Sequence, residues 1–240
     1  MKDNSKVLGV IGGMGPLATQ LFYKMVIENT DAHKDQEHIN MVILSHATMP
    51  DRTEAIMKNR LDDLLARLME DARVLENCGA DYIAIPCNTS HILVDKLQAN
   101  TKLPVINMIQ TAVEKIRHTF EQGTKVGIMA TDGTIKMGLY QKECEKQGLV
   151  PVVPSPENQK RVMKIIYDGV KDGGPIDYDD FEAVETELRD QDCGCVIMGC
   201  TELSCFKEEY RLSEYFIDAM GEMAKRAISL CEKKLRRNGK

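Results

Sequence analysis

The apolar residues of this chain fall into two alternating patterns. Short runs rich in β-branched residues predict strands at 6–11, 39–45, 80–86, 104–107, 125–130, 150–153 and 193–198. Between these runs, apolar residues recur at helical spacing, which predicts helices at 17–29, 51–78, 88–99, 108–120, 135–147, 159–171, 178–190 and 217–236. Strands that alternate with helices are typical of an α/β fold with parallel sheets.

The second half of the pattern repeats the first. The strand that begins at Lys6 is matched by the one that begins at Lys125, and the strand that ends before Cys87 is matched by the one that ends before Cys200. Both offsets are close to half the chain length. We therefore expect two similar lobes, each a small parallel sheet flanked by helices, with the active-site cleft between them. The first lobe is predicted to hold 1–113 and the C-terminal helix region 211–240, and the second lobe to hold 114–210.

Composition narrows the class of protein. The chain has 31 basic and 37 acidic residues, a net charge of −6, which argues against a nucleic-acid surface. No apolar run approaches the roughly 20 residues that cross a membrane, and the N-terminus lacks the pattern of a signal peptide. We expect a cytoplasmic protein with a small-molecule substrate. In that reducing compartment, eight cysteines do not predict a disulfide framework.

A glycine-rich turn at 13–18 fits the fingerprint of a dinucleotide site. That fingerprint also needs a carboxylate at the end of the second strand, and residues 44–47 supply none. Pro16 removes one N–H group that could face a pyrophosphate. The turn therefore favours a smaller anion near Met14, and no nucleotide cofactor is predicted.

Four cysteines cluster within 193–205. Their spacing does not match the separated pairs of common zinc modules, so no metal site is predicted. Cys193 and Cys195 share one face of a predicted strand, where they are expected to pack as small buried residues. The same role is expected for Cys78, Cys144, Cys205 and Cys231.

Cys87 and Cys200 differ from the other six because each directly follows a strand at the carboxyl edge of its sheet. The residues after each are typical helix caps, and a helix N-terminus lowers the pKa of a thiol and binds anions. Two thiols that face each other suit a reaction in which a proton leaves one face of a carbon centre and another arrives at the opposite face. Candidate donors to a substrate carboxylate stand at the predicted strand ends: Asn88, Thr89, Thr131, Thr134 and Thr201.

The chain resembles the aspartate/glutamate racemase superfamily, whose members need no pyridoxal phosphate, in three segments: 12–16, 86–91 and 199–203. Segments 49–53 and 166–173 resemble its aspartate racemase branch. The resemblance implies that Arg52 and Lys171 bind substrate carboxylates, that no cofactor is needed and that the protein is a homodimer. The chain lacks the two motifs typical of glutamate racemases.

The resulting hypothesis is racemisation of an acidic amino acid, L-aspartate to D-aspartate first and glutamate second. Cys87 and Cys200 are the predicted catalytic pair, and by analogy Cys87 acts on the D-enantiomer. The predicted substrate-binding residues are Met14, Arg52, Asn88, Thr89, Thr131, Thr134, Lys171, Thr201 and Glu202. His91 is expected to be structural, Glu202 either supports Cys200 or caps its turn, and Lys164 is the alternative to Lys171. The alternatives are an enzyme like maleate cis–trans isomerase and a non-catalytic protein that binds a dicarboxylate or an amino acid.

Overall fold

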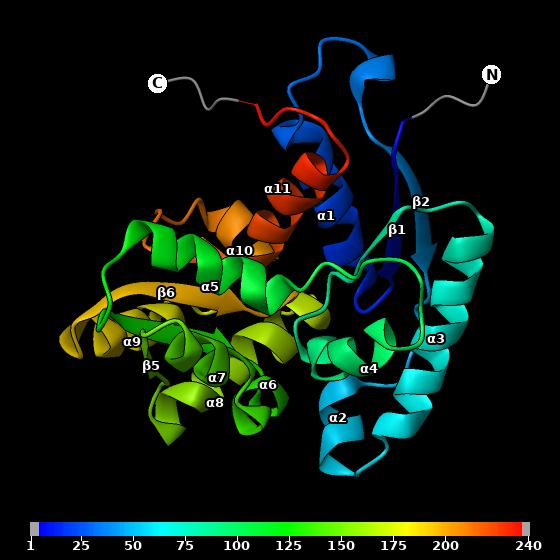
Figure 1. Ribbon diagram of the computed structural model, residues 1–240. Helices are drawn as coiled ribbons and strands as arrows, with labels where there is room; N and C mark the ends of the chain where they lie inside the picture. The colour runs from blue at the N-terminus through cyan, green and yellow to red at the C-terminus, as the bar shows by residue number, and fades with distance from the viewer. Residues whose placement is uncertain (1–4, 237–240) are drawn as a thin grey trace.

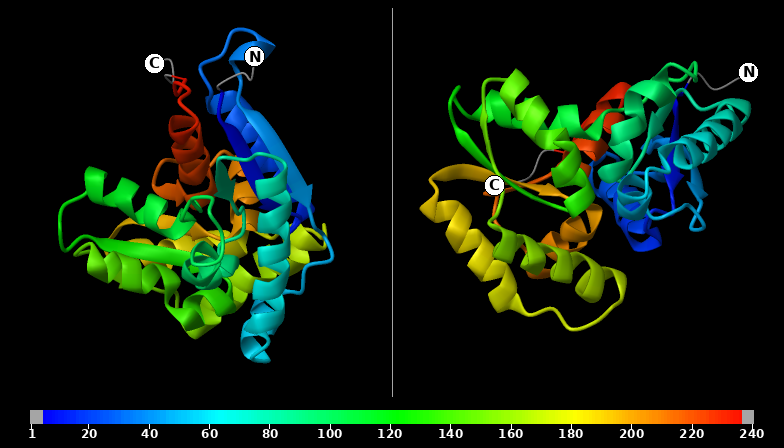
Figure 2. Two further views of the ribbon diagram at one scale, coloured as in Figure 1. Left: turned by 45° about the vertical axis from the view of Figure 1, so that its right-hand side comes forward. Right: turned by 90° about the horizontal axis from the view of Figure 1, so that it is seen from below.

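Two parallel β-sheets flanked by helices form the protein (Figure 1). The computed structural model describes residues 5–236. The strand order is β2-β1-β3 in the first sheet and β5-β4-β6-β7 in the second. The strands are β1 Val7–Gly12, β2 Asn40–Ser45, β3 Tyr82–Ala84, β4 Lys125–Ala130, β5 Val150–Val152, β6 Cys193–Gly199 and β7 Phe216–Asp218. The predicted α/β fold of two similar lobes is confirmed, and Figure 2 shows the lobes side by side.

Helices connect the strands along the whole described chain. The α-helices are α1 Pro16–Asn29, α2 Arg52–Met57, α3 Leu61–Asn77, α4 Val94–Gln98, α5 Met108–Thr119, α6 Asp132–Met137, α7 Leu139–Lys146, α8 Pro156–Lys164, α9 Tyr178–Asp190, α10 Thr201–Tyr210 and α11 Ala219–Leu230. Two 3₁₀ turns, η1 Asp35–Glu37 and η2 Thr89–Leu93, and one π-helical segment, η3 Ile165–Lys171, complete the set.

The two matched segments of the sequence become equivalent strands of the two sheets. β1 lies between β2 and β3, with Val10 opposite Ile43 on one side and Ala84 on the other. β4 lies in the same way between β5 and β6, with Val126 opposite Cys195. Helices cover both faces of such strands, which explains their nearly continuous apolar sequences.

Three predictions for the first lobe were wrong in detail. The predicted helix 88–99 consists of the 3₁₀ turn η2 followed by the short helix α4. The predicted helix 51–78 is interrupted between α2 and α3, where Asn59 adopts a φ of 55°, a left-handed conformation that ends a helix. The predicted strand 104–107 is reduced to one bridge between Ile83 and Val105. Pro104 lacks the N–H group that would continue a strand at that point.

Three predictions for the second half also need correction. The predicted helix 135–147 starts earlier, at Asp132, and is divided into α6 and α7 at Gly138, whose φ of 65° is left-handed. The predicted helix 217–236 begins later, at Ala219, because Phe216–Asp218 forms β7 beside β6. It also ends earlier, at Leu230. The predicted helix 159–171 changes to π-helical geometry in η3, its last seven residues. A π-helical segment is rare and occurs frequently at functional sites.

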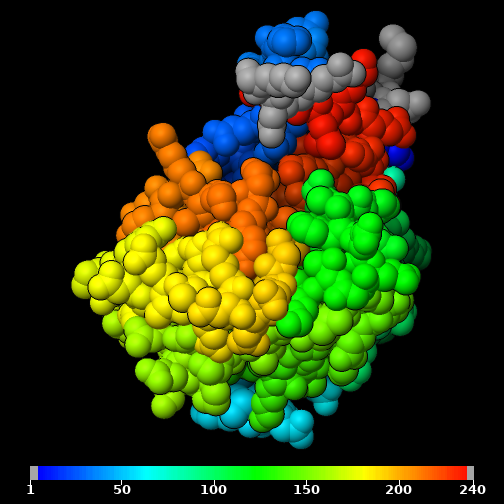
Figure 3. Space-filling view, turned by 90° about the vertical axis from the view of Figure 1, so that its left-hand side faces the viewer, coloured from blue at the N-terminus to red at the C-terminus, as the bar shows by residue number. Residues whose placement is uncertain are grey.

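One of the three clusters of buried side chains among residues 5–236 spans both lobes. The largest cluster of buried side chains combines residues of β1 and α1 with residues of α5, β4, β6 and α11. Helix α11 packs against α1 and α5, and after it Arg236 N–H donates to Asn29 O at 2.7 Å. The red C-terminal segment accordingly lies near the blue N-terminal one in Figures 1 and 3.

The lobe boundaries at residues 113 and 211 stay a prediction. Helix α5 contains residue 113, and β7 belongs to the second sheet. Residues 1–4 and 237–240, which the predicted first lobe includes, lie outside the described part of the chain. Within the described residues, no helix is long and apolar enough to span a bilayer.

Candidate active site

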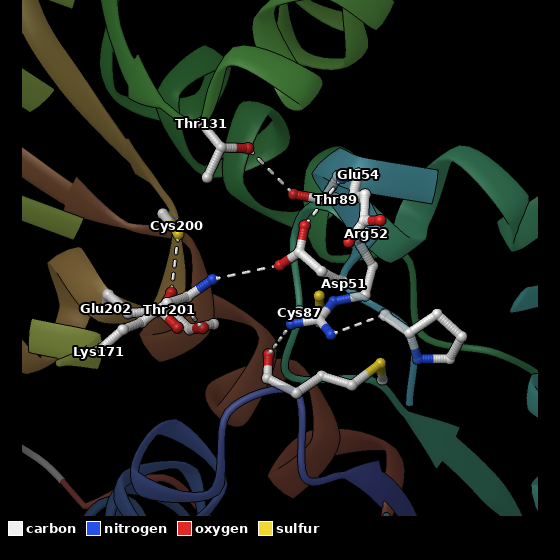
Figure 4. A network of polar contacts seen from close by, with 12 residues as sticks. Asp51, Arg52, Glu54, Cys87, Thr89, Thr131, Lys171, Cys200, Thr201 and Glu202 are labelled. Atoms are coloured by element: carbon white, nitrogen blue, oxygen red, sulfur yellow. Dashed lines mark hydrogen bonds and ion pairs between the residues drawn. The ribbon is translucent and has the colours of Figure 1, made fainter. Parts of the chain in front are cut away.

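A cleft between the lobes collects residues from the carboxyl ends of both sheets (Figure 4). The cavity that these side chains leave free is small, about 10 Å³, which is room for about one water molecule. Any substrate larger than water therefore requires the lining side chains to move apart. Its lining residues are Met14, Asp51, Arg52, Thr53, Cys87, Asn88, Thr89, Thr131, Tyr167, Lys171, Cys200, Thr201 and Glu202.

Cys87 is the thiol of the first lobe. It follows β3 by three residues and is only 5% exposed. The Ser90 hydroxyl donates a hydrogen bond of 3.1 Å to its sulfur, and the positive charge of Arg52 lies nearby. A hydrogen-bond donor and a cation both stabilise negative charge on a sulfur atom.

Cys200 is the thiol of the second lobe and the N-cap residue of α10. It is 6% exposed, and its thiol donates a 2.8 Å hydrogen bond to Glu202 Oε2. Burial, followed by the negative charge and the hydrogen bond of Glu202, raises the pKa of Cys200 well above its ordinary value, although the nearby Lys171 opposes this effect. The contacts of Cys200 therefore favour a protonated thiol.

The other six cysteines do not line the cleft. Burial raises the pKa of Cys144, Cys195 and Cys205 to about 12, which keeps these thiols unreactive at neutral pH. The prediction that all six pack as buried residues was wrong for Cys78, and Cys205 is only half-buried. Cys78 ends α3 at the surface and is exposed.

Three threonine hydroxyls join the lobes beside the thiols. Thr89 Oγ1 lies 2.9 Å from Thr134 Oγ1 and 3.2 Å from Thr131 Oγ1. Thr131 also caps α6, because its hydroxyl accepts from the Thr134 N–H group. Thr89 and Thr131 line the cleft, whereas Thr134 is fully buried behind them. Thr134 therefore holds the other two hydroxyls in place instead of forming part of the lining.

Arg52 brings a guanidinium into the cleft from the start of α2. Its two terminal nitrogens donate to Pro50 O at 3.0 Å and to Met14 O at 3.2 Å. Its Nε is buried and has no hydrogen-bond partner among residues 5–236. Burial lowers the pKa of Arg52, but the charges of Cys87, Asp51 and Glu202 outweigh burial and raise it overall.

Lys171 brings a second cation from the end of η3. Its Nζ lies 3.8 Å from Asp51 Oδ2 and 4.0 Å from the centre of the Tyr167 ring. Burial lowers the pKa of Lys171, but Glu202, Cys200 and Asp51 more than compensate, so the lysine stays charged. Lys164, the alternative in the sequence, instead donates to Asp180 at 2.6 Å and is absent from the lining.

The remaining predicted residues have clear positions. The Glu202 carboxylate accepts from Cys200 and from the Thr201 hydroxyl, so it supports the thiol. His91 is buried outside the lining, where Nδ1 lies 2.9 Å from Cys87 O and Nε2 accepts from Met108 N–H, which agrees with a structural role.

The turn at 12–16 differs from expectation in one respect. Gly13 adopts a φ of 85°, and a Cβ there would lie 2.4 Å from the His46 backbone, so the position requires glycine. Its N–H group donates to Thr19 Oγ1 at 2.8 Å instead of facing an anion. Met14 itself lines the cleft.

Sequence reasoning missed Asp51, Thr53 and Tyr167 as lining residues. Asp51 and Thr53 flank Arg52 in the sequence, and Tyr167 lies four residues before Lys171, roughly one helical turn. That spacing was the available signal. Within residues 5–236, no group of three or more His, Cys, Asp or Glu side chains is arranged to hold a metal ion.

Comparison with known proteins identifies the family. The family model for Asp/Glu/Hydantoin racemase matches residues 11–227. A broad specificity amino-acid racemase, RacX of Bacillus subtilis, is 25% identical over 93% of this chain and 97% of its own. The aspartate racemase of Picrophilus torridus is 27% identical with a TM-score of 0.84, covering 96% of each chain. An aspartate racemase homologue from Pyrococcus horikoshii is 26% identical with a TM-score of 0.77, covering 95% of this chain and 99% of that one. With two thiols and two cations in one cleft of this fold, the chain belongs to the Asp/Glu/hydantoin racemase family and is an amino-acid racemase.

Proposed function

We propose that the protein interconverts L- and D-aspartate, with glutamate as a second substrate, through Cys87 and Cys200 and without a cofactor. The observation that carries the proposal is that one thiol from each lobe lines the same cleft, beside both Arg52 and Lys171. The likeness to the Picrophilus torridus aspartate racemase supports the choice of substrate.

The reaction begins with a thiolate on one side of the substrate and a thiol on the other. The Cys87 sulfur takes the α-proton, and the electron pair of the broken C–H bond spreads into the substrate carboxylate. The Cys200 thiol then delivers its own proton to the opposite face of the carbon. Turnover leaves Cys87 protonated and Cys200 as the thiolate, which is the state that accepts the other enantiomer. By analogy with the superfamily, Cys87 acts on the D-enantiomer.

Two anion sites support an acidic substrate. Asn88, Thr89, Thr131 and Thr201 lie beside the thiols, where the α-carboxylate must be if the α-carbon stands between the two sulfurs. Arg52 and Lys171 then take the side-chain carboxylate, and the unpartnered Nε of Arg52 is an available donor. Aspartate and glutamate differ by one methylene, worth only about 1–3 kcal/mol in a binding site.

The test is racemisation with α-proton exchange in D₂O, measured for the parent protein and for the Cys87→Ser and Cys200→Ser variants. Loss of a positioned base or acid slows such reactions by about 10²–10⁴. Each variant is expected to lose racemisation by at least that factor, whereas the exposed Cys78→Ser serves as the control and keeps it. Racemisation at the parental rate by either active-site variant would contradict the two-thiol mechanism.

A substrate panel separates the remaining alternatives. L- and D-aspartate, glutamate and alanine are followed by chiral chromatography, and maleate is followed by its conversion to fumarate. Conversion of maleate without deuterium incorporation into aspartate would favour a cis–trans isomerase. Binding of aspartate without exchange would favour a binding protein. The homodimer and the cytoplasmic location implied at the level of sequence stay proposals, and analytical ultracentrifugation tests the first.

A further inference from the structure

A buried tyrosine of the second lobe contacts one of the cleft residues of the first lobe. The Tyr140 hydroxyl, on α7, donates a hydrogen bond to Asn88 Oδ1. Tyr140 is fully buried and Asn88 is 2% exposed, so water does not compete for this bond. Asn88 directly follows Cys87, and its side chain forms no cap bond to the 3₁₀ turn η2.

The Tyr140 hydroxyl fixes the orientation of the Asn88 side-chain amide. Burial, followed by the negative charge of Asp218, raises the pKa of Tyr140 well above its ordinary value, so the hydroxyl keeps its proton at neutral pH. No other acceptor for that proton is recorded among residues 5–236. An amide turned the other way would leave the proton without a partner, which is costly in a buried site.

The other end of the amide has no protein partner. Asn88 Nδ2 is buried and makes no hydrogen bond within the described part of the chain, although Asn88 lines the cleft between the two thiols. A buried N–H₂ group carries two donors and ordinarily binds an acceptor. A carboxylate in the cleft is an acceptor of the required kind.

The position of the Tyr140 ring also depends on the second cysteine motif. Gly199, the residue before Cys200, faces the ring, and a Cβ added there would lie 2.9 Å from Tyr140 Cε2. Real Cβ atoms essentially never approach so closely. Because Gly199 has no side chain, the Tyr140 ring can pack between the ends of the two strands that precede the cysteines.

We propose that Tyr140 is a positioning residue that turns the Asn88 amide so that its N–H₂ group binds the α-carboxylate of the substrate. This role rests on the proposed function, because it requires the substrate to lie between Cys87 and Cys200. Tyr140 does not touch the substrate and acts only through Asn88. The second lobe thereby orients a ligand-binding group of the first lobe.

The test is a double-mutant cycle with Tyr140→Phe, Asn88→Ala and the combination, assayed as kcat/KM for aspartate in both directions. Tyr140→Phe is expected to lower kcat/KM about tenfold, with a higher KM, because the amide loses its fixed orientation. In the Asn88→Ala background the same substitution is expected to have no effect. Equal losses in both backgrounds would show that Tyr140 acts only through the stability of the fold and would overturn the proposal.

The matched control is Tyr215→Phe, which removes a buried hydroxyl that has no recorded partner and lies outside the cleft lining. It is expected to keep parental kinetics. The cycle is repeated as Kd of aspartate in a Cys87→Ser background, where turnover does not interfere and a weak Asn88→Ala enzyme can still be measured. Parental racemisation with an unchanged Tyr140→Phe variant would overturn only the role of Tyr140. A parent protein that neither racemises nor binds aspartate would overturn the proposed function, and this role with it.

Discussion

Asp51 already pairs with Lys171, which in the proposed function binds the side-chain carboxylate of the substrate. It comes from the start of α2 in the first lobe and lies 3.8 Å from Lys171 in the second. A carboxylate that binds Lys171 therefore competes with the negative charge of Asp51 for this cation. At this distance the attraction is about 1 kcal/mol in water and about 4 kcal/mol near a protein surface. The two side chains are 35% and 25% exposed, so screening favours the lower figure, about 1 kcal/mol or a fivefold change in affinity.

The substitution Asp51→Asn removes this competing charge and keeps the helix cap. Asp51 Oδ1 accepts from Glu54 N–H at 2.8 Å, and asparagine caps helices equally well. The variant is expected to lower KM for both enantiomers of aspartate about fivefold, with little change in kcat, and to leave KM for alanine unaltered. The control is Glu54→Gln, which removes the same charge from the same helix outside the cleft lining. An unchanged KM would refute the competition, an equal effect of both variants would show a general charge effect, and a raised KM would show that Asp51 binds the substrate itself.

Three further predictions concern Cys200, Gly199 and the buried His91. Glu202→Gln removes the charge that helps to raise the pKa of Cys200. In the proposed mechanism Cys200 deprotonates one of the two enantiomers, and the pH at which kcat/KM rises for that enantiomer is expected to move down, which a pH–rate profile measures. Gly199→Ala places a Cβ 2.9 Å from Tyr140 Cε2, and the overpacking is expected to cost about 1–3 kcal/mol in urea unfolding and to reduce aspartate turnover. Burial lowers the pKa of His91 below its ordinary 6.5, so near that pH the unfolded chain takes up a proton at this histidine and the folded chain does not. The free energy of unfolding is therefore expected to fall as pH decreases from about 6.5 to the folded-state pKa. In His91→Gln this part of the pH dependence is expected to vanish.

The sequence predicted those parts of the fold that local patterns determine. β1 and β4 are runs of apolar residues that end at glycine or threonine turns, and their likeness revealed the duplication. The short β7 escaped prediction because three residues carry no periodicity, and it is a strand only because β6 lies beside it. The break at Asn59 likewise depends on a left-handed residue inside an otherwise helical pattern.

The site was predictable where its residues follow strands directly. Cys87 and Cys200 could be singled out because the carboxyl ends of parallel strands meet at one edge. Arg52 and Lys171 needed the resemblance to a family, since a cation on a helix usually faces solvent. Tyr140 could not be predicted, because an aromatic residue at helical spacing is typical of a core residue. Only the structure shows that its hydroxyl donates to Asn88 of the other lobe.

The two thiols that arise from the duplication differ in their hydrogen bonds. Cys87 accepts a hydrogen bond from Ser90, whereas Cys200 donates one to Glu202. The second residue after each cysteine explains the difference, since Thr89 in the first motif is replaced by a carboxylate in the second. Under the proposed mechanism, the contacts of Cys200 suit the thiol that acts as the acid. One turnover reverses the two protonation states and leaves a thiolate beside Glu202, the less stable arrangement. The return of a proton to Cys200 is therefore favourable.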